Sequence, residues 1–343
     1  MNEKALINAI SYYLPEKVLT NEDISTQHPE WTVDKITSKI GIQTRHIASE
    51  QETASDLAFF AAMQLFEENK NIKKEDIDYV ILCTQSPDYF LPSSACILQH
   101  RLGLSKTCGA FDFNLGCSGY IYGLGIAKGL ILSNQASNIL LLTGETYSKY
   151  IHKDDKGNKT IFGDAGTASL ISSFILYGGI NACIENFAYG TDGSQGDALI
   201  VRNGCAKYSS GNSVFKVTDS GDYLSNDDSL YMDGKAIFNF TAFQVPPLIK
   251  KVLEKNSMEL LDIDRFIFHQ ANEFMLTTVR KRCNIPEEKF YIDIRDIGNT
   301  VSNTIPIALK RAFDEGLFLN DKNLLLAGFG VGLSMGSVIL KLQ

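Results

Sequence analysis

The sequence predicts an α/β protein with largely buried sheets, and two observations support this fold class. Apolar segments of four or five residues alternate with longer amphipathic segments along the chain. Strands and helices that alternate in this way form layered folds, because each helix must bury one face against a sheet. The second observation is an internal repeat, in which elements of the first half recur in the same order in the second half.

The predicted strands are short apolar runs bounded by polar or turn residues. They lie at 79–83, 110–113, 138–142 and 167–171 in the first half, and at 265–268, 289–293, 323–327 and 337–341 in the second half. The predicted helices are amphipathic segments at 54–69, 119–133, 238–255 and 303–315.

The repeat predicts two topologically similar halves. The matching segments are 76–83 with 262–269 and 138–144 with 323–328, and each pair encloses a second strand and a glycine-containing turn, at 115–118 and 297–300. Apolar strands can resemble one another by chance, but three elements that recur in order favour two related halves. We expect the halves to span residues 1–174 and 175–343. The strand ends that carry Cys117, His269 and Asn299 would then meet where the halves adjoin, a usual place for a ligand cleft.

Length and composition indicate a well-cored globular chain. Its 343 residues are 44% hydrophobic and 21% charged, which suits about two domains or one large one. The net charge of −8 argues against a general nucleic-acid binder, which needs clustered cations. No apolar run approaches the roughly 20 residues that span a bilayer, and the start, Met1 to Lys4, lacks the shape of a signal peptide. These observations predict a cytoplasmic protein without nucleic-acid or membrane partners.

Seven cysteines form no CxxC pair, so we expect reduced thiols, most of them small buried residues. No histidine and cysteine cluster has zinc-ligand spacing, and we therefore predict no metal site.

Cys117 differs from the other cysteines in its context. The predicted strand at 110–113 leads into Asn114-Leu-Gly-Cys-Ser-Gly119, and a long apolar helix follows. A thiol at such a turn lies near a helix N-terminus, which favours the thiolate. The helix contains Gly119, Gly123, Gly125 and Gly129, so we expect it to be buried and closely packed at the centre of the molecule. The alternative is that Cys117 is only a small buried residue at a tight turn.

A nucleophilic thiol needs proton transfer and donors for a developing oxyanion. Among the five histidines, only His269 directly follows a predicted buried strand, whereas His152 lies in a hydrophilic loop and should be solvated. Asn299, in Gly298-Asn-Thr300, is the candidate partner of His269. Both residues have a structural alternative, since a single buried histidine and a turn asparagine are common in proteins.

Two further motifs are weak. Gly332-Leu-Ser-Met-Gly336 matches the GxSxG pattern of serine hydrolases, but that serine must lead into a helix, and the remaining residues, Ser337 to Gln343, are predicted to form a strand. Gly123-Leu-Gly125 lies inside a helix and lacks the spacing of a dinucleotide-binding loop.

Taken together, Gly116-Cys-Ser-Gly119, His269-Gln-Ala-Asn272 and Gly298-Asn-Thr300 resemble the β-ketoacyl-acyl-carrier-protein synthase III family. The resemblance covers essentially the whole chain. It implies a thiolase-like α/β fold, with two pseudo-symmetric βαβαβαββ halves in an αβαβα layered arrangement. It also implies an acyltransferase that uses no cofactor and takes a coenzyme A thioester as substrate.

The resemblance implies a decarboxylating Claisen condensation. Cys117 would accept an acyl group from acyl-coenzyme A, and malonyl-acyl-carrier protein would then lose carbon dioxide and attack the acyl group. His269 and Asn299 would stabilise the enolate, and the backbone amides of Cys117 and Gly332 would form the oxyanion hole.

Other family positions imply substrate contacts. Trp31 would stack on the adenine of coenzyme A, and Lys156 stands where the family usually has an arginine, so it keeps the charge but not the flat stacking surface. Phe238 and Asn272 are implied as further substrate-binding residues. Leu91 matches a residue that crosses a homodimer interface to close the partner's acyl pocket.

The sequence departs from the family at four positions. Val331 replaces a glycine and Met335 a tryptophan, which should reshape the acyl pocket. Phe274 and Asn239 occupy positions of basic residues that help an acidic carrier protein to dock, so they put that partner in doubt.

Two alternatives follow from these departures. One is a related condensing or acyl-transfer enzyme of specialised lipid, saccharide or secondary metabolism that uses another acceptor. The other is a non-catalytic homologue that binds acyl thioesters, although a buried histidine and asparagine without a function would still need hydrogen-bond partners.

Overall fold

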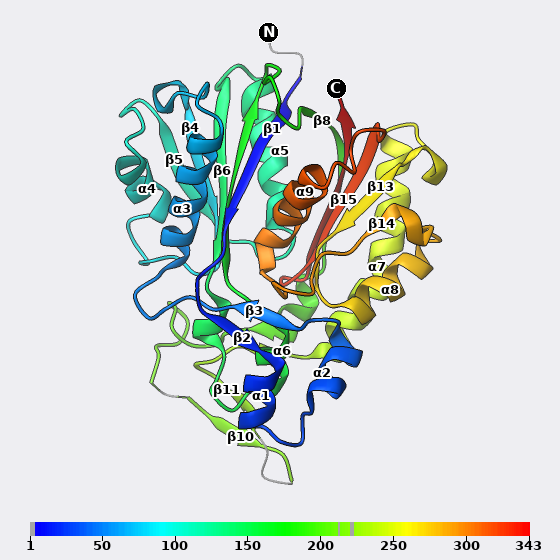
Figure 1. The fold of residues 1–343 in the computed structure, drawn as a ribbon. Helices are drawn as coiled ribbons and strands as arrows, with labels where there is room; N and C mark the ends of the chain where they lie inside the picture. The colour runs from blue at the N-terminus through cyan, green and yellow to red at the C-terminus, as the bar shows by residue number, and fades with distance from the viewer. Residues whose placement is uncertain (1–3, 212, 220–222) are drawn as a thin grey trace.

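A mixed sheet of ten strands organises the part of the chain that the structure describes, residues 4–211, 213–219 and 223–343 of this computed structural model (Figure 1). Its strands are β1 (Leu6–Tyr13), β4 (Tyr79–Cys83), β5 (Gly109–Phe113), β6 (Asn138–Glu145), β7 (Ala165–Ser172), β8 (Ala182–Thr191), β13 (Arg265–Phe268), β14 (Phe290–Tyr291), β15 (Asn323–Gly330) and β16 (Ser334–Leu342). Met1 to Glu3, part of the segment examined for a signal peptide, lie outside the described residues.

The helices are α1 (Asn21–Gln27), α2 (Val33–Ile40), α3 (Ala54–Glu68), α4 (Ser94–Leu102), α5 (Gly119–Leu132), α6 (Lys156–Ile161), α7 (Gly234–Lys255), α8 (Glu273–Arg282) and α9 (Thr304–Asp314). Short two-stranded pairs are formed by β2 (Val18–Thr20) with β3 (Thr44–His46), β9 (Leu199–Ile200) with β12 (Tyr231–Met232), and β10 (Phe215–Val217) with β11 (Tyr223–Asn226). No helix within the described ranges has both the length and the apolar character that a membrane crossing requires.

The strand order repeats itself across the sheet. The strands of the first half are ordered β5-β4-β6-β7-β1 and those of the second half β14-β13-β15-β16-β8. In each set the first two pairings are parallel and the next two antiparallel. The two sets join through β1 and β8, where Leu6 pairs with Cys183 and Ile7 with Ala182. The proposed boundary at residue 174 falls between β7 and β8 and stays a prediction.

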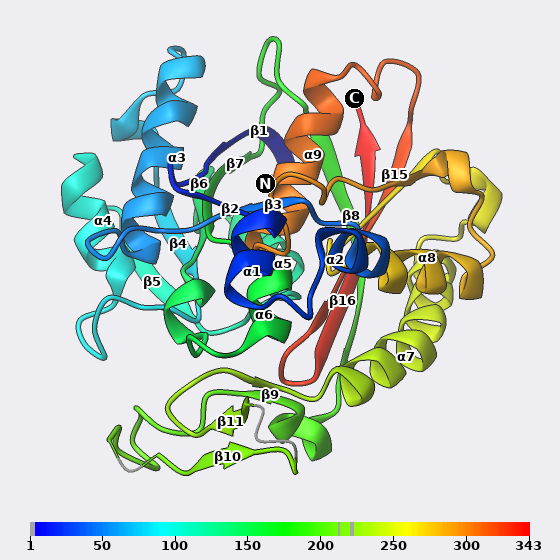
Figure 2. The ribbon, with the colours of Figure 1, turned by 60° about the horizontal axis from the view of Figure 1, so that its bottom comes forward.

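Helices lie in three layers around the two sets of strands (Figure 2). α3 and α4 pack on the first set, whereas α7 and α8 lie beyond the second set, which α7 contacts. Between the two sets, α5 contacts strands of both, including β6 and β15, and α9 contacts β1 and β13. The structure confirms the predicted α/β class and the eight predicted strands.

The first turns of helix α5 are closely packed at the centre of the molecule, as the glycines of this helix predict. A Cβ atom on Gly119 would lie 2.2 Å from the sulfur of Cys83, and one on Gly123 would lie 2.8 Å from Leu141. Gly129 differs, because a Cβ atom there would meet nothing within 4 Å. Close packing therefore explains the early glycines of the helix but not the last one.

Two central strands were not predicted. In β1 the polar residues Asn8 and Ser11 interrupt the apolar pattern, and in β8 Glu185 and Asn186 do so. Asn8 and Ser11 are nevertheless fully buried, because Asn8 donates to Asn181 Oδ1 at 3.0 Å and Ser11 donates to Glu68 at 2.7 Å. Tertiary partners therefore satisfy polar groups that a local pattern would place at the surface.

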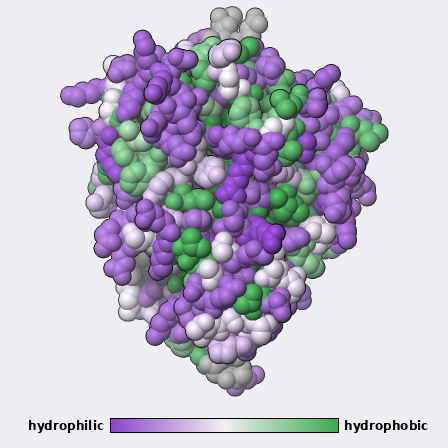
Figure 3. Space-filling model, in the orientation of Figure 1, coloured by the Kyte–Doolittle hydropathy of each residue, from purple (hydrophilic) through white to green (hydrophobic). Residues whose placement is uncertain are grey.

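One end of the molecule carries the irregular elements. α1, α2, α6 and the β2–β3 and β10–β11 pairs gather at the end opposite to the two termini (Figure 1). The face shown in Figure 3 is mainly hydrophilic, with small scattered hydrophobic areas, as expected for an acidic chain in water.

The packing of α3 on β7 yields a stability prediction. A Cβ atom on Gly166 would lie 2.2 Å from the backbone carbonyl carbon of Leu57, so Gly166→Ala requires the helix and the strand to separate. We expect this variant to lose about 1–3 kcal/mol of unfolding free energy, measured by urea unfolding. Gly129→Ala is the matched control and should be neutral or stabilising by up to about 1 kcal/mol. Equal stability of the two variants would contradict the close approach.

Candidate active site

Cys117 lies in the turn between β5 and α5, one residue before Ser118, the N-cap of the helix. Its side chain is buried, with 4% exposure. Strand β15 passes directly beside it, because Cβ atoms on Gly328 and Gly330 would lie 2.7 Å from the Cys117 carbonyl oxygen and 2.8 Å from its Cβ atom. Only glycine permits this approach at both positions.

The hairpin between β15 and β16 is tied to the same turn. The hydroxyl oxygens of Ser118 and Ser334 lie 2.6 Å apart, and Ser334 also donates to the Val331 carbonyl oxygen at 2.9 Å. A backbone hydrogen bond from Val331 reaches the Cys117 sulfur. The amide that faces the thiol is therefore that of Val331, whereas the oxyanion role of its neighbour Gly332 stays a prediction.

The pKa of the Cys117 thiol is raised to about 12, mainly by burial and then by the charge of Glu145, although the backbone bond from Val331 acts in the opposite direction. Glu145 ends β6 and is fully buried. Its carboxyl group accepts hydrogen bonds from the Ser302 hydroxyl at 2.9 Å, the backbone N–H of Gln85 at 3.1 Å and the Ser86 hydroxyl at 3.3 Å. Burial raises the pKa of Glu145 to about 8. The sequence analysis missed this carboxyl group, because nothing local distinguishes it from an exposed glutamate at a strand end.

His269 follows β13, as predicted, and its backbone N–H donates to the Ala327 carbonyl oxygen at 2.8 Å. The ring nitrogen Nδ1 lies 2.7 Å from the Thr304 hydroxyl oxygen, and the ring packs edge-on against Phe329. Burial lowers the pKa of His269 to about 3, so the imidazole is neutral at physiological pH.

Asn299 is held by its backbone against the segment that precedes β7. Its N–H donates to the Ile161 carbonyl oxygen at 2.9 Å, and its own carbonyl oxygen accepts from the Gly163 N–H at 3.0 Å. The side-chain oxygen Oδ1 accepts from the Val301 N–H at 2.9 Å. Because Oδ1 is engaged, the amide nitrogen Nδ2 is the group of Asn299 that can donate to a ligand.

Val301 contacts two of the three predicted residues, Asn299 and His269, and lies beside Gly116, the residue that precedes the third. Its amide bonds to Asn299, its backbone carbonyl bonds to the His269 ring, and its side chain would lie 3.2 Å from a Cβ atom on Gly116. Val301 also has a φ of +59°, which is unusual for a β-branched residue and typical of tightly constrained functional sites. The structure therefore brings the three motifs together in one buried place.

Of the predicted coenzyme A contacts, Trp31 lies in the segment between α1 and α2, and Lys156 is the first residue of α6. The Lys35 ammonium lies 5.2 Å from the centre of the Trp31 ring, and the Lys156 ammonium lies 2.6 Å from a carboxylate oxygen of Glu30. Lys156 is thus paired with the residue that precedes Trp31, an acidic group whose pairing the sequence analysis did not take into account.

Phe238 and Asn272 lie at the starts of α7 and α8. Phe238 stacks on Phe274 with the ring centres 5.5 Å apart. The Asn272 side-chain oxygen accepts from the Met275 N–H at 2.8 Å, so this asparagine also caps its helix. The predicted substrate role of both residues stays a prediction.

Leu91 lies in the loop between β4 and α4 and is 82% exposed. The loop borders a cavity of about 1170 Å³, whose far wall comes from Leu199, Val201 and Leu230. Gln85 and Val331 also line this cavity, but Cys117 does not.

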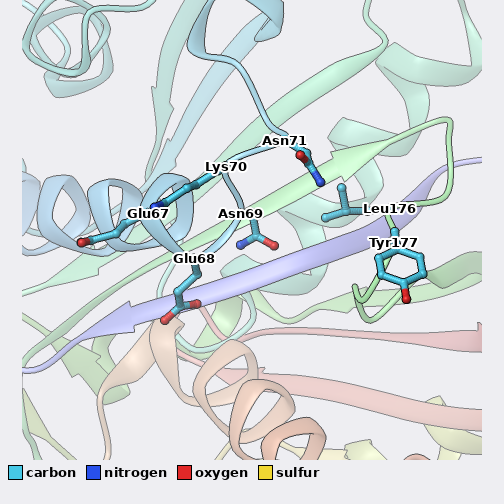
Figure 4. A pocket seen from close by; sticks show the side chains of 7 residues that line it. All are labelled: Glu67, Glu68, Asn69, Lys70, Asn71, Leu176 and Tyr177. Carbon is cyan, nitrogen blue, oxygen red and sulfur yellow. The ribbon is translucent and has the colours of Figure 1, made fainter.

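A second hollow is unrelated to this site. It is lined mainly by the polar residues 67–71, together with Leu176 and Tyr177 (Figure 4). These residues end α3 or follow α3 and β7, at the edge where Ser172 pairs with Asn138, the first residue of β6. Cys117 follows the carboxyl end of the parallel strands, so the two sites lie at opposite ends of the sheet.

Two expectations about other residues can be compared with the structure. His152 is not solvated as predicted, because its ring stacks on Tyr223 at 4.5 Å. Ser334 begins the strand β16, which confirms that the GxSxG pattern does not lead into a helix. Within residues 4–211, 213–219 and 223–343, no three histidine, cysteine or acidic side chains are grouped as metal ligands.

Comparisons with known proteins agree with the resemblance seen in the sequence. Residues 111–193 match the family model described as 3-oxoacyl-[acyl-carrier-protein (ACP)] synthase III, and residues 253–342 match its C-terminal model. The β-ketoacyl-[acyl-carrier-protein] synthase III of Clostridium perfringens is 36% identical over 330 residues, which cover 96% of this chain and 97% of that protein. The enzyme of the same name from Fusobacterium nucleatum is 34% identical over 98% of both chains.

Solved structures show the same similarity. A crystal structure of 3-oxoacyl-(acyl-carrier-protein) synthase III is 42% identical, with a TM-score of 0.93 over 98% of this chain and 99% of that one. The synthase III from Thermus thermophilus is 30% identical, with a TM-score of 0.84 over 98% and 99% of the two chains. These matches confirm the predicted thiolase-like fold.

The surroundings of Cys117 predict how its reactivity depends on pH. Because burial raises the thiol pKa, the thiolate is scarce at neutral pH and grows about tenfold per pH unit. We expect the rate of Cys117 alkylation by iodoacetamide, followed by peptide mass spectrometry, to rise without a plateau from about pH 7 to pH 9.

Glu145→Gln tests the electrostatic part of this prediction. The Glu145 carboxyl ionises near pH 8, so its negative charge opposes the thiolate mainly above that pH. The variant should be alkylated faster than the wild type at about pH 9 and at a similar rate at about pH 7. A plateau below about pH 7 in the wild type would show instead that the helix N-terminus outweighs burial.

Proposed function

The chain belongs to the β-ketoacyl-acyl-carrier-protein synthase III family of condensing acyltransferases in fatty acid biosynthesis, and we propose that Cys117 is its nucleophile and that His269 and Asn299 serve the condensation step. The observation that carries the proposal is the meeting of the three motifs around Val301. The first substrate is acyl-coenzyme A and the second is malonyl-acyl-carrier protein.

In the first step, the Cys117 sulfur attacks the thioester carbonyl carbon. The carbon–sulfur bond to coenzyme A breaks, and coenzyme A leaves as a thiol that takes up the proton lost by Cys117. The proposed oxyanion donors are the backbone amides of Cys117 and Gly332, and the amide of Val331 is a further candidate, because it already has a backbone hydrogen bond to the sulfur. Each donor of this kind is worth about 2.7–4 kcal/mol of the barrier.

In the second step, malonyl-acyl-carrier protein loses carbon dioxide, and the resulting carbanion attacks the acyl carbonyl carbon. A new carbon–carbon bond forms and the bond to the Cys117 sulfur breaks. His269 and Asn299 donate hydrogen bonds to the oxygen of the malonyl thioester while it carries enolate charge. Burial suits His269 to this role, because it keeps the ring neutral and strengthens the hydrogen bond.

For Nε2 of His269 to donate, Nδ1 must accept a hydrogen bond. The Thr304 hydroxyl lies 2.7 Å from Nδ1 and supplies this bond when its proton turns to the ring from the Val301 carbonyl oxygen, which is 3.1 Å away. Thr304 is therefore a positioning residue for the tautomer of His269.

The coenzyme A and carrier-protein contacts are proposed on family positions. Trp31, Phe238 and Asn272 would contact coenzyme A, and Lys156 would have to share its charge between Glu30 and the nucleotide. The helix α8 ends with the basic residues 280–282, which supports docking of an acidic carrier protein although Phe274 and Asn239 are not basic.

We propose a homodimer on the evidence of the loop that carries Leu91. Tyr89, Phe90 and Leu91 are 61%, 80% and 82% exposed, and an apolar cluster of this size on a loop is typical of a protein interface. A cytoplasmic location is supported by the cysteines, all seven of which are unbridged.

A related condensing enzyme of specialised metabolism is the second candidate. It is favoured by Val331 and Met335, whose side chains fill space on the hairpin beside Cys117, Met335 lying against Gly190 and Val331 against Gly116. Incubation with acyl-coenzyme A and either malonyl-acyl-carrier protein or malonyl-coenzyme A separates the candidates. A β-ketoacyl product from neither extender, with Cys117 acylated, would favour the second candidate.

The roles of the three residues predict distinct defects. Cys117→Ala should abolish the acyl-enzyme seen by intact-protein mass spectrometry after exposure to acyl-coenzyme A. His269→Ala and Asn299→Ala should retain acylation but lower the rate of condensation by about a hundredfold or more, because each removes an enolate donor. Condensation at the wild-type rate in both variants would refute the assigned roles.

The homodimer predicts an effect of charge at Leu91. Leu91→Asp should shift the protein from dimer to monomer in light scattering, because the carboxylate would be desolvated in the interface. Leu319→Asp is the control, since Leu319 is 86% exposed in a segment away from this loop. A wild-type protein that is monomeric at micromolar concentration would refute the proposal.

A further inference from the structure

The large cavity approaches the catalytic turn but does not reach its sulfur. The cavity has a volume of about 1170 Å³, and its lining includes Gln85, Tyr147 and Val331. Cys117 is not part of this lining, and its side chain is only 4% exposed. The residues that separate the two spaces therefore decide whether an acyl chain on Cys117 can extend into the cavity.

Two of the residues that line the cavity, Gln85 and Val331, lie close to Gly116, which directly precedes the nucleophile. A Cβ atom on Gly116 would lie 2.4 Å from the side-chain oxygen of Gln85 and 2.6 Å from a methyl carbon of Val331. Both side chains thus lie in contact with the residue that directly precedes Cys117. Both side chains also line the cavity, and the pair is called the wall below.

Gln85 is held rigidly in this wall, because all of its polar groups are bonded. Its side-chain oxygen accepts from the Tyr147 hydroxyl, and its side-chain amide donates to Asn114 at 2.9 Å. Its backbone N–H donates to Glu145 at 3.1 Å, and its backbone carbonyl accepts from the Tyr150 hydroxyl at 3.2 Å.

The buried carboxyl of Glu145 links this wall to the condensation residues. It accepts hydrogen bonds from both Gln85 and Ser302, which lies three residues after Asn299. Turning the Gln85 side chain aside would break its hydrogen bonds to Tyr147 and Asn114, whereas its backbone bonds to Glu145 and Tyr150 fix the position of the residue, so opening the wall has an energetic cost.

We propose that Gln85, braced by Tyr147 and paired with Val331, is the residue that limits the length of the acyl group on Cys117. This inference rests on the proposed function, since it concerns the acyl-enzyme. The wall confines the starter to short acyl groups of the acetyl to butyryl class and keeps medium-length chains out of the cavity. Removal of the Gln85 side chain would join the cavity to the sulfur and convert it into a pocket for longer chains.

The test compares acylation of Cys117 by acetyl- and decanoyl-coenzyme A, measured as initial rates by intact-protein mass spectrometry. In the wild type the decanoyl rate should be a small fraction of the acetyl rate. In Gln85→Ala the ratio of decanoyl to acetyl rates should rise by about tenfold or more. Gln85→Met, which refills the space without the carboxamide, should keep the wild-type preference, and Gln64→Ala on the exposed face of α3 should change nothing.

A second variant guards against misfolding. If Gln85→Ala has lost its thermal transition, Val331→Gly removes the other half of the wall and should raise the same ratio. A wild type that accepts decanoyl- as fast as acetyl-coenzyme A would overturn the inference. An unchanged ratio in the folded Ala and Gly variants would also overturn it.

Alkylation separates this inference from the proposed function. The rates of Cys117 alkylation by iodoacetamide and by N-decyl iodoacetamide depend on the wall but not on acyl transfer. If no acyl-coenzyme A acylates Cys117, but Gln85→Ala selectively raises the rate of alkylation by N-decyl iodoacetamide, the proposed function is refuted and the inference about the wall is supported. If Cys117 is acylated, but the variants change neither the ratio of decanoyl to acetyl rates nor the ratio of the two alkylation rates, the inference about the wall is refuted and the proposed function is not.

Discussion

The close approach of strand β15 to the Cys117 turn is the constraint on which the rest of the site depends. Gly328 and Gly330 place the backbone of the second half against the carbonyl oxygen and the side chain of Cys117, at distances that exclude a side chain at either position. This contact brings the hairpin amide of Val331 to the sulfur. It also places Phe329 against the ring of His269, so one pair of glycines aligns groups from both halves of the chain.

Burial gives these groups their chemical character. A neutral His269 and a protonated thiol are the forms that a low-dielectric site favours, and both pKa directions follow from burial. Hydrogen bonds formed in such a site are stronger than those formed in water, which is what an enolate donor requires. The helix N-terminus at Ser118 and the Val331 amide oppose the cost of charging the sulfur. Glu145 adds a charge of the unfavourable sign that is expressed only when its own carboxyl ionises.

Most departures from the family pattern lie around this site, whereas Val331 lies within it, because its amide bonds to the Cys117 sulfur. Val331 fills space that a glycine would leave open, and it does so next to Gln85, where a cavity approaches the nucleophile. Lys156 keeps a positive charge near Trp31 but shares it with Glu30. At the start of α8, Phe274 presents an aromatic ring to solvent and stacks on Phe238. Val331 therefore belongs to both the catalytic turn and the cavity, since its amide bonds to the sulfur and its side chain lines the cavity.

Local patterns were sufficient to predict the α/β class and the eight strands with continuous apolar runs. These features depend on residues that are close together in the chain, because hydrophobic periodicity and turn preferences are properties of short segments. Local patterns also singled out Cys117, His269 and Asn299, but these residues were assigned to one site only through the internal repeat and the resemblance to a known family. The strands β1 and β8 were missed, since Asn8, Ser11 and Glu185 break the periodicity and only distant partners make such residues acceptable in a sheet. Glu145, Gln85 and the Lys156–Glu30 pair were missed for the same reason: a polar side chain acquires its burial, its pKa and its role from neighbours far away in the sequence, and only the folded chain places those neighbours beside it.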